Sequence, residues 1–140
     1  MPRARLLSLL MLLLLSTGIN AGEMLKTNTS WDGGDFHYPE GTPEVTSLLL
    51  ILDEGQVTPW HCHPVPTFGY VLEGAIEVET RAGDHIVLRQ GQSVVEVMKT
   101  LHRGRGLDGG GRVLVFYAGV SELANTVLVD DREQAELCRP

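Results

Sequence analysis

Short apolar runs separated by glycine-rich polar stretches make up most of the chain after residue 43. The runs recur at intervals of about ten residues with turn-forming boundaries, which is typical of short β-strands. In order, they are EVTSLLLILD, TFGYVLEG, AIEVET, HIVLR, SVVEVM and RVLVFYAG. Strands joined in this way predict an all-β domain, an antiparallel sandwich or barrel.

Alternation within the runs predicts which side chains are buried. In AIEVET, Ile76 and Val78 alternate with two glutamates, which is the two-residue period of a half-buried strand. The same period places Phe68, Tyr70 and Leu72 on one face of the preceding run, and we expect this face to lie in the core. Tyr70 alone among these three has a polar tip that could reach a pocket.

The segments outside the runs divide the chain. Residues 22–43 are polar and turn-rich, and we expect them to form an ordered lead-in without regular elements. Residues 44–119 contain all the predicted strands, with a turn predicted at the DGGG of residues 108–111. Residues 120–140 form a C-terminal tail in which one or two helical turns are expected near the end.

The first 21 residues have the layout of a secretory signal peptide. Arg3 and Arg5 precede an unbroken apolar run, and small and polar residues follow, ending at Ala21. The apolar run is too short for a comfortable membrane span, although an uncleaved N-terminal anchor is the alternative. We expect cleavage after Ala21 and export, most simply to a bacterial periplasm or by secretion, with no membrane contact after cleavage.

Charge narrows the choice of partners. The formal net charge is −7, and removal of two arginines with residues 1–21 would make it −9. An acidic domain without a basic patch argues against nucleic acid or an anionic membrane as a partner. We expect a small-molecule ligand or substrate instead.

The two cysteines, Cys62 and Cys138, leave two alternatives open. An oxidising compartment permits a disulfide between them. Because two cysteines are weak evidence for a disulfide framework, and Cys138 lies near the end of the chain where ordering is poor, two unpaired thiols are the favoured prediction.

A histidine pair lies in the stretch TPWHCHPVPTFGY. In an extended strand, His61 and His63 face one side and Cys62 faces the other. Two imidazoles one pleat apart can bind the same metal ion through neutral ring nitrogens, so metal affinity should fall below about pH 6.5, the unperturbed histidine pKa. A polar surface pair is the alternative.

The wider spacing resembles two sequence motifs of the cupin superfamily. Gly55, His61, His63 and Gly74 match the first motif, and the stretch from Gly91 to His102 matches the second. The resemblance implies that residues 44–119 form a single antiparallel cupin β-barrel of the jelly-roll type. It also implies that His61, His63 and His102 bind one divalent metal ion: iron, zinc, copper, manganese or nickel.

The chain departs from the cupin pattern at Thr67. Family members commonly have a glutamate ligand at this position, and a neutral hydroxyl is a poor substitute. A site of three neutral histidines leaves the ion its full charge, and should therefore attract a small anionic molecule.

Two functions follow from the resemblance. One is a metal-dependent enzyme with dioxygenase-like or Lewis-acid chemistry, for which Glu96 and Tyr70 are candidate catalytic residues. The other is a non-catalytic protein that binds a small ligand or sequesters metal. The resemblance and the exposed strand edges expected of a small barrel also predict a homodimer.

Overall fold

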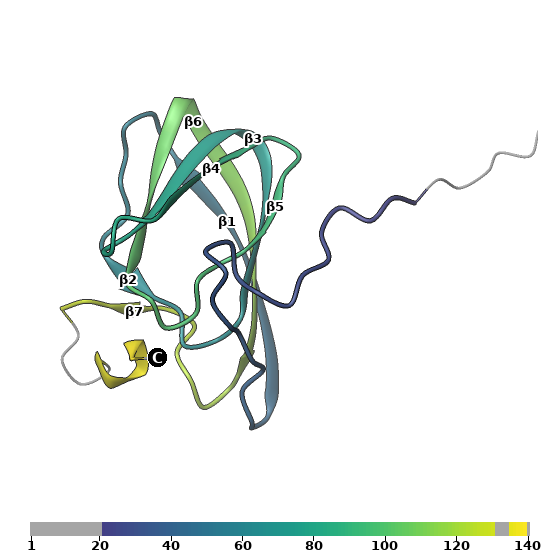
Figure 1. Ribbon diagram of the computed structural model, residues 1–140, viewed down its shortest axis with the longest axis vertical. Helices are drawn as coiled ribbons and strands as arrows, with labels where there is room; N and C mark the ends of the chain where they lie inside the picture. The colour runs from purple at the N-terminus through teal and green to yellow at the C-terminus, as the bar shows by residue number, and fades with distance from the viewer. Residues whose placement is uncertain (1–20, 131–134, 140) are drawn as a thin grey trace, which may run out of the picture.

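The computed structural model describes residues 21–130 and 135–139. The predicted signal peptide therefore lies outside the described residues, apart from Ala21. The elements of the described part are shown in Figure 1. They are β1 (Pro43–Leu52), β2 (His61–Cys62), β3 (Thr67–Thr80), β4 (His85–Arg89), β5 (Ser93–Val95), β6 (His102–Val120), β7 (Val127–Leu128) and the 3₁₀-helix η1 (Ala135–Cys138).

All seven strands belong to one antiparallel sheet that curves around a common interior (Figure 1). The long strands β3 and β6 pair with each other along most of their length. Strand β6 also pairs with β1 and β2, whereas β3 pairs with β4 and β5. The predicted all-β antiparallel fold is confirmed. No helix in the described ranges is long and apolar enough to span a membrane.

The predicted turn at DGGG is wrong, because these residues lie inside β6. Asp108, Gly109 and Gly110 all have positive φ, and the ladder passes from the pair Gly74–Gly111 directly to the pair Ala75–Leu107. The extra residues therefore form a bulge that bends the strand without reversing it. The DGGG run does mark a break in regular β geometry, but β6 continues to pair with β3 on both sides of it.

Burial in β3 confirms one predicted face and corrects the other. Ile76 and Val78 are buried, as the alternation in AIEVET predicts. The prediction of a core face formed by Phe68, Tyr70 and Leu72 is wrong: Leu72 is 43% exposed, and the other two are only half-buried. This half of the strand is apolar on both sides, so its composition did not distinguish them.

The interior side of that half-strand is formed by the alternate residues Thr67, Gly69 and Val71, all buried. Gly69 leaves room for the side chain of Val94, which a Cβ on the glycine would meet at 3.0 Å. On the outer side, the lead-in covers part of Phe68 through an edge-on contact with Phe36.

Cys62 and Cys138 form a disulfide, so the favoured prediction of two unpaired thiols is wrong. Strand β7 pairs with β2, and Val129 donates a hydrogen bond to the carbonyl of Trp60. This pairing carries the C-terminal residues to the side of β2 on which Cys62 lies, and η1 packs beside β7 (Figure 1). The helical turn expected near the end of the tail is confirmed by η1.

Candidate metal centre

Three histidines from two strands meet at one end of the sheet interior. His61 begins β2, His63 lies just beyond it, and His102 begins β6, where it is paired with His61. Their ring centroids are 4.4–5.0 Å apart, and one nitrogen of each lies within 4.8 Å of the others. The two-residue period therefore placed His61 and His63 on one side correctly, with Cys62 turned away.

Each imidazole is oriented by a main-chain carbonyl. Nδ1 of His61 donates to the carbonyl of Pro59 at 2.8 Å, and Nδ1 of His102 donates to that of Thr100 at 2.8 Å. Nδ1 of His63 donates to the carbonyl of Asn125 at 2.9 Å. Since a carbonyl can only accept, the proton of each ring lies on Nδ1, and Nε2 keeps its lone pair.

Burial holds the three rings in the neutral form. The pKa of His63 lies well below its usual value because the ring is desolvated and because His102 and His61 are close by. Desolvation, followed by the charge of His102, lowers the pKa of His61, and desolvation also lowers the pKa of His102. Three neutral imidazoles with convergent Nε2 lone pairs are a donor set that fits a divalent transition metal.

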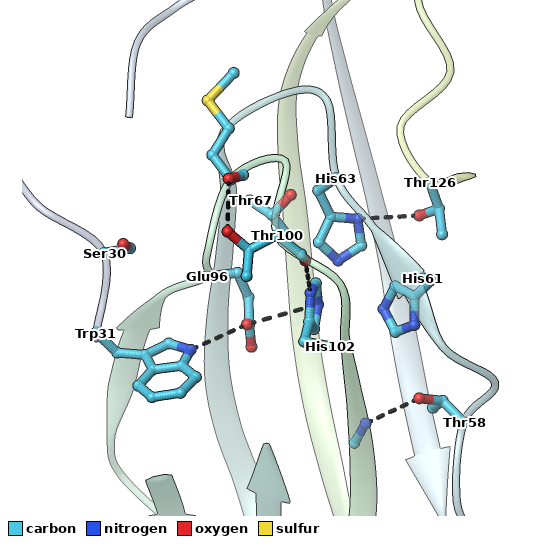
Figure 2. A network of polar contacts seen from close by, with 12 residues as sticks. Ser30, Trp31, Thr58, His61, His63, Thr67, Glu96, Thr100, His102 and Thr126 are labelled. Atoms are coloured by element: carbon cyan, nitrogen blue, oxygen red, sulfur yellow. Dashed lines mark hydrogen bonds and ion pairs between the residues drawn. The ribbon is translucent and has the colours of Figure 1, made fainter. Parts of the chain in front are cut away.

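Glu96 is the carboxylate beside the three histidines (Figure 2). Its side chain is 13% exposed, and Oε2 lies 3.8 Å from Nε2 of His102. Burial raises the pKa of Glu96, and the indole of Trp31 opposes this by donating from Nε1 to Oε2 at 3.4 Å. Of the two candidate catalytic residues, Glu96 thus lies at the site.

Tyr70 does not line this site. It lies on the side of β3 opposite to Thr67 and Gly69, which do line the cavity. Thr67 is buried and donates from Oγ1 to the carbonyl of Val65 at 3.1 Å. Its hydroxyl is therefore inside the site but already engaged, in agreement with the expectation that it is not a ligand.

A cavity of about 230 Å³ adjoins the histidines. The walls away from the histidines are apolar, and most of their residues come from β1, β3 and β6. The main apolar lining residues are Leu48, Leu50, Ile76, Val78, Val113 and Val115. A small molecule with an apolar body could occupy this space with one polar group against the histidines.

Sequence reasoning missed three residues that shape the site. Trp31 comes from the lead-in, and a tryptophan amid polar residues was a usable signal that the segment packs on the domain. Asn125 acts through its carbonyl, and Thr126 places its hydroxyl 3.2 Å from Nδ1 of His63. Neither has a sequence signal, because their role depends on β7 reaching β2.

The family model described as "Cupin domain" matches residues 48–117, which is half of the chain. No match was found among curated proteins.

Solved structures that share the fold include a lyase and a cupin-like protein. The DMSP lyase DddQ from Ruegeria pomeroyi DSS-3 is 24% identical with a TM-score of 0.55, over 71% of this chain and 48% of that one. This chain thus spans about half the length of that lyase. A cupin-like protein from Thermotoga maritima is 18% identical with a TM-score of 0.53, over 66% of this chain and 71% of that one. At these identities, the likeness concerns the fold.

Proposed function

Because the chain belongs to the cupin family, we propose that it binds one divalent metal ion through His61, His63 and His102 and acts on a small molecule in the adjoining cavity. The observation that carries this proposal is the orientation of the three rings. Each Nδ1–H is donated to a carbonyl, so each Nε2 presents a lone pair to the same region. Metal-binding histidines in proteins are oriented in this way.

We propose that the protein is an enzyme of the dioxygenase or Lewis-acid type. A bound ion would supply Lewis acidity or, if redox-active, oxygen chemistry. The chain itself would exclude water with the apolar walls that Ile76 and Val113 help to form. The substrate would be a small organic molecule with an apolar body and one polar or anionic group directed at the histidines.

A non-catalytic role in ligand binding or metal sequestration is the second candidate. It is favoured by the composition of the cavity, since Glu96 is the one acidic residue among the described residues that line it. There is also no serine or cysteine nucleophile among them. In this role, the protein would bind its ligand without converting it chemically.

Export and dimer formation remain proposals. The Cys62–Cys138 disulfide supports an oxidising compartment, as the predicted signal peptide does. Strand β1 supports a homodimer because, in the part of the chain that the structure describes, it pairs with β6 alone and exposes Val45 and Ile51. An exposed apolar edge strand is usually covered by another chain or element.

Titration calorimetry with Zn²⁺ on the parent and on His102→Ala tests the metal site. We expect the substitution to weaken binding by far more than the roughly 10- to 100-fold typical of outer-shell changes. His85→Ala is the matched control, because His85 is exposed at the start of β4. Binding by His102→Ala as tight as that of the parent would refute the site.

Metal content and turnover separate the two functions. A redox-active metal in protein purified from its native source would favour oxygenase chemistry, and zinc would favour Lewis-acid chemistry. Chemical conversion of candidate small molecules by the parent but not by His102→Ala would indicate an enzyme. Binding of such molecules without conversion would indicate the non-catalytic role.

A further inference from the structure

Glu96 and Thr67 are neighbours across the β3–β5 ladder. The register pairs Phe68 with Val95, and the next step of the ladder is a hydrogen bond from the amide of Glu96 to the carbonyl of Thr67 at 2.9 Å. Directly opposed residues of an antiparallel pair project their side chains to the same side of the sheet. Both residues accordingly line the cavity.

The carboxylate of Glu96 faces a group that cannot donate to it. Its Oε2 lies 3.8 Å from Nε2 of His102, and the proton of that ring is on Nδ1, bonded to Thr100. Two atoms with lone pairs thus face each other in a buried site. Among the described residues, the side-chain donor to Glu96 is Trp31, and this hydrogen bond is long at 3.4 Å. A carboxylate that is to stay ionised in such surroundings is stabilised by a nearby cation.

We propose that Glu96 is a fourth protein ligand of the metal ion, supplied by the strand that faces Thr67. The inference rests on the metal site proposed above. Two ligand atoms that each lie about 2.0–2.2 Å from one ion are at most about 4.4 Å apart. The 3.8 Å between Oε2 of Glu96 and Nε2 of His102 falls within this limit.

The lead-in positions this carboxylate. The main-chain amide of Trp31 donates to the carbonyl of Val95 at 3.0 Å, next to Glu96, and its indole reaches Oε2 (Figure 2). The segment before β1 therefore closes this side of the site. With Glu96 bound, the ion keeps one net positive charge instead of two, so the site should favour neutral or singly charged ligands over multiply charged anions.

Calorimetric titration of Zn²⁺ into four proteins tests the proposal: the parent, Glu96→Gln, Thr67→Glu with Glu96→Gln, and Glu77→Gln. Glu96→Gln should lose about 100-fold or more in affinity, above the range for outer-shell partners. Adding Thr67→Glu should restore much of it, because the carboxylate then returns from the opposite strand. Glu77→Gln removes the same charge outside the cavity, where Glu77 lies near Arg105, and should leave the Zn²⁺ affinity unchanged.

Visible absorption of the Co²⁺-loaded proteins gives a second readout. Loss of a directly bound carboxylate changes the coordination sphere, so the spectrum of Glu96→Gln should differ from that of the parent. An unchanged spectrum, or parent-like Zn²⁺ affinity in Glu96→Gln, would overturn the proposal while leaving the three-histidine site standing. A parent protein that binds neither metal would instead refute the proposed function itself. Thermal melting of each variant verifies that it is folded.

Discussion

Removal of the Cys62–Cys138 disulfide should cost the protein a large part of its stability. Cys138→Ser is the cleaner substitution, because Cys62 is fully buried in β2, where its replacement would also disturb the strand that carries His61. Without the bond, the contacts of the described C-terminal residues with β2 are the short β7 ladder and the neighbouring hydrogen bond from Val129 to Trp60.

The magnitude follows from the length of the closed loop. The bridged residues are 76 positions apart. In the chain-entropy account, a loop of this length loses about 15 cal/mol/K of unfolded-state entropy, which is about 4.5 kcal/mol at 25 °C. Measured losses on removal of native disulfides run from about 2 to 5 kcal/mol. Domains of this kind are stable by only about 5–15 kcal/mol, so the variant should unfold at a much lower urea concentration.

Urea unfolding of the metal-free proteins measures the effect. We expect the highest urea midpoint for the parent. The parent with reductant and Cys138→Ser should both unfold at lower, similar urea concentrations. Thiol titration of the unfolded, unreduced parent should find no free thiol. Two reactive thiols, or a parent midpoint that reductant does not move, would refute the assignment of the bond and restore the sequence-based expectation of unpaired cysteines.

Three further outcomes are expected. Zn²⁺ affinity should stay constant as pH is lowered to about 6.5, the usual pKa of histidine, and should fall only when pH is lowered further. The reason is that burial lowers the pKa values of all three histidines, that of His63 most. Calorimetry that shows the affinity falling from about pH 7 would contradict this. Metal-free Glu96→Gln should melt at a higher temperature than the metal-free parent at neutral pH, because burial raises the pKa of Glu96 and the parent therefore becomes less stable as pH rises through that pKa. The difference in melting temperature should disappear below about pH 4.3, where the carboxyl group is protonated in the folded and unfolded states. A difference that does not change with pH would argue against ionisation of Glu96 as its cause. In urea unfolding, Gly83→Ala should lower the free energy of unfolding by about 1–3 kcal/mol because of its φ of 99° alone, since the space around its Cβ is open. Gly74→Ala (φ 68°) should lower it by more, because its Cβ would also overlap the carbonyl of Gly110. Equal losses in the two variants would refute the steric argument.

The parts of the fold that follow from local rules could be predicted. The alternation around Ile76 and Val78 gave the buried face of the second half of β3. The spacing of His61 and His63 gave their common side, because side chains alternate in any extended strand. Resemblance to a known motif was needed for His102, which lies 39 residues further along the chain than His63.

Features that depend on distant pairing could not be predicted. The face presented by Phe68 and Leu72 is set by what covers β3, and both sides of that half-strand are apolar. The glycines at 109–111 indicate a break in regular geometry equally well for a turn or a bulge, and pairing with β3 decides between them. The partner of Cys62 is fixed only when β7 joins β2.

The carbonyls that orient the histidines have a consequence for how this protein can change over generations. Pro59, Thr100 and Asn125 each contribute a main-chain oxygen, which every amino acid possesses. Their side chains can therefore drift while the acceptors persist, provided that the path of the backbone is kept. Related sequences could differ at these three positions and still present the same imidazole tautomers. A comparison of residue identities would therefore not detect the acceptors that orient the histidines.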